Sequence, residues 1–178
     1  ARLGSGTASS STVLYGDQTY KTEPSGGKLL QVVSITSTIA FSTSNQTLTD
    51  TGISLDITPS ATSSKILVLV TAAIATSNAA IGTGFGLRRG TTDIGVGADD
   101  SNKVGVSGGG GYGQSNSLIN VASNHLDSPS TTSATTYHIT LRTRSGGTVA
   151  YIGRDPVDYD ADYTINPVST ITLMEIGA

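Results

Sequence analysis

Two histidines are the only bases in this sequence suited to activating a Ser or Thr nucleophile. His138 falls on the polar face of an expected strand, and His125 lies shortly before a turn, in the sequence Asn-His-Leu-Asp. The G-x-S-x-G motif of a nucleophile elbow does not occur in the chain. We therefore interpret His138 as a solvated side chain, and His125 as either a ligand contact or a turn residue.

The carboxylates are poorly arranged for glycan cleavage, which requires two of them about 5–10 Å apart. The only two Glu residues, Glu23 and Glu175, lie near opposite ends of the sequence. Asp158, Asp160 and Asp162 alternate along one segment, a spacing that suits a hard cation such as calcium, although the Gly and Glu of an EF-hand loop are missing. This segment is either a solvated acidic loop or a calcium site, and no other metal or cofactor is expected.

The remaining candidate chemistry is recognition of a ligand by side chains in loops. Tyr offers contact area and a hydroxyl at low entropic cost, which makes it common on binding surfaces. Asn, His, Arg and Asp beside such tyrosines can hydrogen-bond a hydroxyl-rich ligand, and the alternative for each Tyr is a half-buried strand position. The predicted receptor-binding residues are Tyr112, Asn116, His125, Arg154, Asp155, Tyr159 and Tyr163.

The composition excludes several classes of protein. Gly, Ser and Thr make up about two fifths of the chain, and Gly and β-branched residues disfavour a helical bundle. A net charge of −3 with 36% apolar residues is unlike a disordered chain and provides no basic surface for nucleic acid. The longest apolar run is too short for a membrane helix. Because the chain has no Cys, disulfides and thiolate metal sites are impossible.

Alternating apolar residues and regularly spaced turn signals predict about eight short strands. We expect an all-β protein, with an antiparallel β-sandwich or jelly-roll-like domain over residues 28–178. Residues 1–27 are expected to form an extended connector with one small turn at Tyr15-Gly16-Asp17. Gly146 and Gly147 predict a hairpin turn, and the Gly-rich stretch 105–117 predicts a flexible loop or a close approach of backbones. The strand candidates are residues 29–35, 53–57, 65–75, 85–89, 94–96, 118–121, 136–144, 149–152 and 169–176.

Residues 65–75 are apolar on both faces of the expected strand. Such a strand is either covered on both sides within its own chain or meets another subunit with its outer face. The chain has only two Phe, one Met and no Trp, so its own core is thin. We therefore expect burial between copies of the chain, that is, an oligomer.

The connector carries a resemblance to a known kind of protein. Residues 3–20, LGSGTASSSTVLYGDQTY, resemble an element of roughly LGxGTxSSxTxLxGDxxW that recurs in fibre proteins of tailed bacteriophages, with Tyr20 where those sequences often have Trp. Much of the remainder resembles C-terminal domains of fibre proteins from marine and cyanobacterial phages. The matching segments are residues 27–33, 58–68, 126–137 and 169–176.

This resemblance implies a homotrimeric virion protein, located outside the cell, whose β-rich domain often binds the host surface. Its partners would be its own copies, an upstream fibre shaft or other virion proteins, and a glycan or protein of the bacterial surface, without nucleic acid or membrane insertion. Residues 155–166 are longer and more acidic than the family leads us to expect, at a place where partner specificity would vary. A trimer would also add avidity to three weak sites.

Two other functions remain open. One is a purely structural fibre, decoration protein or filament subunit, in which the connector or residues 29–35 join a neighbour's sheet. The other is a polysaccharide depolymerase, which the scarcity of Glu disfavours. The expected function is non-enzymatic attachment of a virion to a bacterium.

Overall fold

The computed structural model describes residues 4–22, 27–78, 80–110, 117–157, 162 and 164–177. These residues form β-strands and no helix, so none of them belongs to a helix that could cross a membrane. The strands are β1 (Thr12–Leu14), β2 (Tyr20–Thr22), β3 (Leu29–Ser37), β4 (Phe41–Thr43), β5 (Thr49–Ile57), β6 (Lys65–Thr76), β7 (Thr83–Arg89), β8 (Thr92–Ile94), β9 (Gly108–Gly110), β10 (Ile119–Asp127), β11 (Thr135–Thr143), β12 (Ala150–Ile152) and β13 (Ser169–Ile176).

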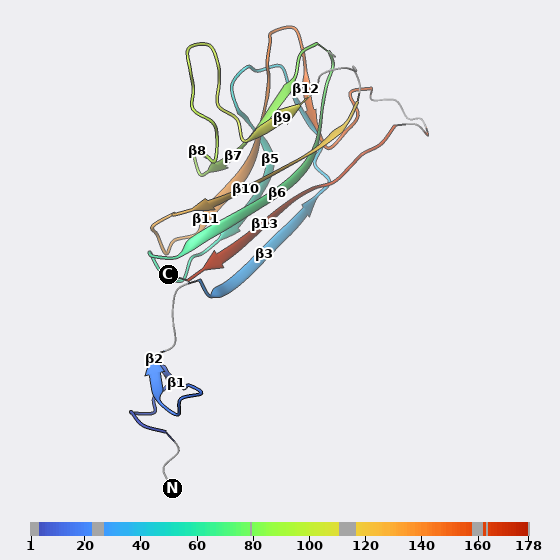
Figure 1. Ribbon diagram of the computed structural model, residues 1–178. Coiled ribbons are helices and arrows are strands. Elements are labelled where there is room, and N and C mark those ends of the chain that lie inside the picture. The colour runs from blue at the N-terminus through green and yellow to red at the C-terminus, as the bar shows by residue number, and fades with distance from the viewer. Residues whose placement is uncertain are drawn as a thin grey trace.

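The front sheet is organised around β6, the longest strand. One edge of β6 pairs with β10. Its other edge pairs first with β13 and then, towards its end at Thr76, with β12. β3 and β4 pair in turn with β13 and β12. The sheet is therefore four strand positions wide, with β10, β6, β13 and β3 side by side (Figure 1).

The back sheet has the order β5–β11–β7, and β7 carries both β8 and β9 on its free edge. Along the chain the long strands alternate between the two sheets, because β3, β6, β10 and β13 lie in front while β5, β7 and β11 lie behind. This alternation is the connectivity of a jelly roll. The expected all-β, antiparallel sandwich is confirmed.

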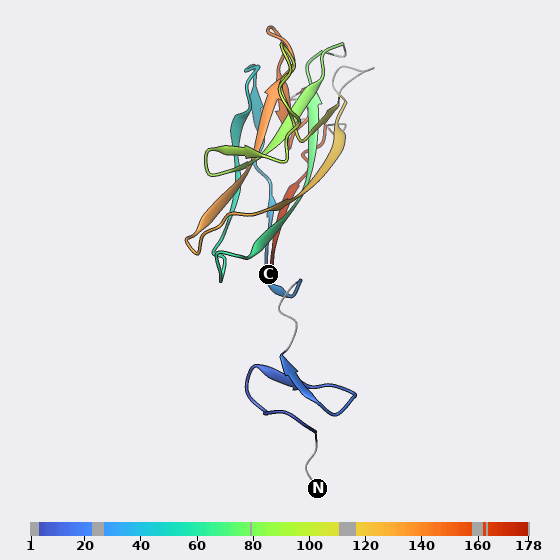
Figure 2. The ribbon, with the colours of Figure 1, turned by 60° about the vertical axis from the view of Figure 1, so that its left-hand side comes forward.

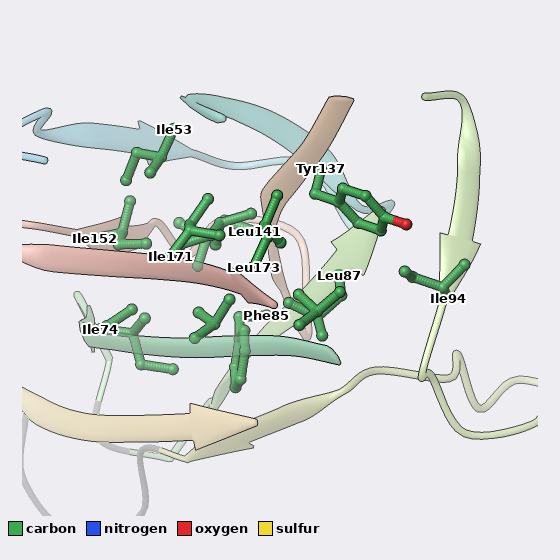
Figure 3. Close-up of a cluster of buried hydrophobic side chains, with 14 of the residues drawn as sticks. Ile53, Ile74, Phe85, Leu87, Ile94, Tyr137, Leu141, Ile152, Ile171 and Leu173 are labelled. Atoms are coloured by element: carbon green, nitrogen blue, oxygen red, sulfur yellow. The ribbon is translucent and has the colours of Figure 1, made fainter. Parts of the chain in front are cut away.

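The core lies between the two sheets and consists of side chains from alternate strand positions. On β11 the inward residues Tyr137, Ile139 and Leu141 are fully buried, as their alternation predicts. They pack against aliphatic residues of β6 and β13 and against Phe85 and Leu87 of β7 (Figure 3). Burial of such side chains contributes about 1.5–3 kcal/mol each, which makes this cluster the main stabilising feature of the fold.

Three predictions need correction. The strand expected at residues 94–96 is β8, which ends at Ile94 and leaves Gly95 and Val96 outside it. Residues 118–121 are only the start of β10, which continues to Asp127. The sequence did not indicate this length, because Ser123 and His125 interrupt the alternation of inward apolar residues. The hairpin predicted at Gly146 and Gly147 is wrong. β12 pairs with β6 and β4, so the chain crosses from the back sheet to the front sheet at this turn.

The Gly-rich segment follows the second of its two expected alternatives where the structure describes it. Gly108–Gly110 form β9, which pairs with β7. A Cβ on Gly109 would lie 2.5 Å from the carbonyl oxygen of Thr83, so only Gly allows this approach of two backbones. Residues 111–116 lie outside the described residues.

The connector is not wholly extended, because β1 and β2 form a small antiparallel hairpin. Its turn includes the expected Tyr15-Gly16-Asp17 and is closed by the Gln18 N–H, which donates to the Tyr15 carbonyl at 2.9 Å. Figure 2 shows this hairpin outside the sandwich. The sandwich begins where the Gly27 N–H donates to the Gly177 carbonyl at 2.7 Å. We call this the connector end, and the opposite end, where β6 finishes at Thr76, the far end.

Candidate functional site

The structure describes three of the seven predicted receptor-binding residues, namely His125, Arg154 and Asp155. The other four, Tyr112, Asn116, Tyr159 and Tyr163, lie outside the described residues. The same holds for Asp158 and Asp160 of the calcium candidate, while Asp162 is exposed. Within the described part of the chain, no three acidic or His side chains come together in an arrangement that could hold a metal ion.

The three described residues do not form one site. His125 lies within β10, opposite the buried Val68, and packs against Gly95, where a Cβ would approach its side chain to 3.0 Å. Arg154 and Asp155 follow β12, which pairs with β6 at Ile74. Six residues of β6 separate these two levels, or about 20 Å at the rise of a strand.

Arg154 and Asp155 shape the chain as it leaves β12 at the far end. The guanidinium of Arg154 lies 5.0 Å from the ring centroid of Tyr151, a cation–π contact. Asp155 Oδ1 accepts the N–H of Val157 at 2.9 Å, which fixes a turn. These contacts leave Arg154 and Asp155 half-buried rather than fully solvated.

The polar side of β11 is less solvated than its alternation predicts. Thr140 is buried, and only 8% of the surface of Arg142 is exposed. The chain between β8 and β9 and the side chain of Leu48 cover this side, since a Cβ on Gly84 would meet Val106 and one on Gly86 would meet Leu48. His138 is also not freely solvated, because its Nδ1 lies 2.9 Å from Asp50 Oδ2.

A cavity of about 360 Å³ opens on this covered side, at the far end of the back sheet. Glycines allow the walls of this cavity to approach closely, because a Cβ on Gly84 would come within 2.8 Å of Val106 and one on Gly82 within 3.1 Å of Arg144. The cavity is lined by Gly82, Thr83, Gly84, Val104, Val106, Gly109, Gly110, Arg142 and Arg144.

Arg142 is the chemically distinctive residue of this far-end cavity. Its Nε is buried and has no hydrogen-bond partner among the residues that the structure describes. Burial lowers the pKa of its guanidinium, an effect that the carboxylate of Asp99 opposes. Sequence reasoning missed Arg142 because alternation alone placed it on a solvated face. The cross-strand neighbour Gly84, against which Val106 packs, is not recognisable as its partner from the sequence.

Two buried carboxylates lie at the connector end, on either side of Ile66 in one cross-strand row. Asp127 accepts the Tyr137 hydroxyl at 2.7 Å and pairs with Arg89 at 2.7 and 2.8 Å. Burial, followed by this bond to Asp127, raises the pKa of Tyr137. Glu175 accepts the N–H and hydroxyl of Ser60 and the amide of Gln31. Burial would raise the pKa of Glu175, but these hydrogen bonds outweigh it and lower the pKa to about 2.

The outward side of the front sheet has no charged side chain over three successive rows of four strands. The first row is entirely apolar, and the next two are rich in hydroxyls. These hydroxyls bond to one another, Ser34 to Thr172 at 2.8 Å and Thr71 to Thr170 at 2.6 Å. We call this surface the front face. Its first row is Val32, Met174, Leu67 and Leu126, its second row is Ser34, Thr172, Leu69 and Asn124, and its third row is Thr36, Thr170, Thr71 and Ala122.

A scan against protein-family models gives no match to this sequence, and a search of curated proteins gives none either.

Proposed function

We propose that this chain is the distal domain of a homotrimeric virion fibre that attaches to a bacterial surface without enzymatic activity. The observation that carries the proposal is the front face, an exposed sheet surface without charge. Leu126 is 55% exposed, Val32 48% and Leu69 36%. An exposed antiparallel face ordinarily alternates apolar inside with polar outside, whereas the centre of a subunit interface is depleted of charge.

The hydroxyls of the front face favour contact with another protein surface. Burying a hydroxyl costs free energy unless it keeps a hydrogen bond. Ser34, Thr172, Thr71 and Thr170 already bond across the strands of their own sheet, so a neighbour could cover them at little cost. Ala73 and Ala75 on the outer side of β6 are already buried within the chain, and Leu67, Leu69 and Thr71 would then be buried between copies.

Closed rotational symmetry about one axis suits the placement of the two ends. A trimer of parallel protomers, packed through the front face, gathers all connectors at one end of the assembly. The far end, with the turn around Gly147 and the segment after β12, is then presented away from the shaft (Figure 1). That geometry supports attachment through the far end.

Strand exchange between subunits is less well supported. β3 pairs with β13 of its own chain through eight registered positions, from Leu29 to Ser37. Donation of residues 29–35 to a neighbour would require this pairing to be replaced. A filament built by strand donation from β3 is therefore disfavoured relative to face-to-face packing.

The oligomer is tested with Leu69→Glu, which places a charge at the middle of the front face. We expect the unchanged chain to have the mass of a trimer by light scattering and the variant to be a folded monomer. Ile165→Glu is the matched control, because Ile165 is 58% exposed and lies outside the front face. A monomeric unchanged chain at micromolar concentration, or a Leu69→Glu trimer, would contradict the proposal.

Attachment is tested separately with the fluorescently labelled trimer on a panel of bacterial cells. Saturable binding to particular strains is expected, with the monomeric Leu69→Glu variant binding more weakly because it loses avidity. The absence of binding across a broad panel, combined with a normal trimer, would favour the purely structural fibre.

A further inference from the structure

The far-end cavity is lined by Arg142, whose buried Nε has no hydrogen-bond partner among the described residues. We propose that this cavity binds a small carboxylate-bearing ligand and that Arg142 holds the carboxylate. The inference goes beyond the proposed function, because it concerns binding by the single domain and does not depend on a trimer or on a bacterial surface.

The state of Arg142 points to a missing anion. A guanidinium carries five N–H donors and loses free energy when it is buried without acceptors. Arg142 is 92% buried, since its exposed fraction is 8%, and its Nε has no partner among the described residues. A carboxylate matches the planar fork of a guanidinium with two parallel hydrogen bonds. A ligand of this kind would supply an acceptor for Nε that the described residues do not.

The charge around the cavity suits a singly charged ligand. Arg142 of β11 and Arg144, the residue that directly follows β11, both line it. Asp99 is the acidic group whose charge acts on Arg142, and its Oδ1 already accepts the Gly105 N–H at 2.6 Å. Asp99 offsets part of the positive charge of Arg142, which favours a singly charged carboxylate over a phosphate dianion.

The size and walls of the cavity suit a molecule with a single ring. Its volume of about 360 Å³ is at the lower end of the range for small-molecule sites, about 300–1,000 Å³. Val104 and Val106 provide apolar contact, while the backbone of Gly109 and Gly110 provides polar groups close to the ligand. A monosaccharide acid combines such a ring with one carboxylate, so galacturonate is a suitable probe.

The test is calorimetric titration of the unchanged chain with galacturonate, galactose and inorganic phosphate at constant ionic strength. We expect saturable binding of galacturonate at one site per chain. Galactose has the same ring without the carboxylate and lacks the charge-assisted hydrogen bonds. It should therefore bind at least about tenfold more weakly than galacturonate. Equal binding of galactose, tighter binding of phosphate, or no binding of galacturonate up to about 30 mM would overturn the proposal.

Variants locate the site. Arg142→Met keeps most of the aliphatic stem and should reduce galacturonate affinity by about tenfold or more. Arg88→Met is the matched control on the same sheet, because Arg88 is already paired with Asp93 at 2.7 Å, and it should leave binding unchanged. Val104→Phe fills the cavity while retaining Arg142, and should also abolish binding. This second variant keeps the proposal testable if Arg142→Met fails to fold. Normal binding by Val104→Phe would overturn the assignment.

Failure of this test is distinguishable from failure of the proposed function. The galacturonate titration can be carried out on the monomeric Leu69→Glu variant, whose substitution lies on the front face and not in the cavity. A trimer that binds cells but not galacturonate would leave the fibre proposal in place and remove only the carboxylate site.

Discussion

The two ends of the sandwich treat buried ionisable side chains in opposite ways. At the connector end, Asp127 and Glu175 accept several hydrogen bonds each. At the far end, Arg142 is also buried, yet its Nε has no partner in the described part of the chain. The two carboxylates lie at the level of Ile66 of β6. The far-end cavity lies at the level of Ala75, whose carbonyl accepts the hydroxyl of Thr83 of β7. Nine residues of β6, about 30 Å of strand, separate these two levels.

This contrast separates buried charges that maintain the fold from buried charges that are available to a ligand. A satisfied charge is costly to remove, because its former partners become unsatisfied. An unsatisfied charge already carries its desolvation cost in the folded protein, so its removal costs little. The comparison therefore predicts effects on stability of different size at the two ends.

The largest effect is expected for Asp127→Ala at the connector end. The substitution leaves the buried Tyr137 hydroxyl and Arg89 without their acceptor and breaks a bond between the two sheets. The free energy of unfolding should fall by about 3 kcal/mol, measured by urea denaturation. Tyr137→Phe, which removes one hydrogen bond and leaves the Arg89 pair, should cost about 1 kcal/mol. Equal costs for the two variants would show that Arg89 contributes nothing to this cluster.

An intermediate effect is expected at Glu175 and should depend on pH. The folded pKa of about 2 lies below the ordinary value of 4.5, so the carboxylate stabilises the fold fully above pH 4.5. This stability is lost progressively as the pH falls towards 2. Glu175→Gln should lower the free energy of unfolding at pH 7 by about 1–3 kcal/mol, measured in the same way. The variant should also lose part of the acid sensitivity between pH 5 and 2, and an unchanged acid profile would contradict this account.

The smallest effect is expected for Arg142→Met at the far end. Because the buried Nε has no partner to lose, the free energy of unfolding should change by less than about 1 kcal/mol or increase. Thermal unfolding without added ligand measures this change. A loss as large as that of Asp127→Ala would show that Arg142 supports the fold, and would end the contrast between the two ends.

The sequence predicted those elements whose residue pattern is local. The strand at residues 169–176 matches β13, and residues 65–75 match β6 to within one residue, because each has a continuous or cleanly alternating apolar pattern. β10 was underestimated because inward Ser123 and His125 break its pattern. The crossing at Gly147 was missed because a turn sequence does not specify which sheet receives the next strand.

The candidate site was harder to predict, because its defining features are not local. Arg142 belongs to a regular alternation, and only its cross-strand neighbour Gly84 and the covering Val106 show that it is buried. Four of the seven residues proposed for receptor binding lie outside the described residues, and the three others lie at two levels of β6 about 20 Å apart. That assignment stays a prediction.

The paired backbones of Gly27 and Gly177 have a consequence for how such a domain can be exchanged. Each donates its N–H across the same short junction, Gly27 to Gly177 and Gly177 to Lys28, so both termini of the sandwich leave from one point. A recombination event or an engineered graft therefore needs only one compatible seam to move the whole module to a new support. The far end contains neither terminus, and its internal loops can diversify in length and sequence without disturbing that seam.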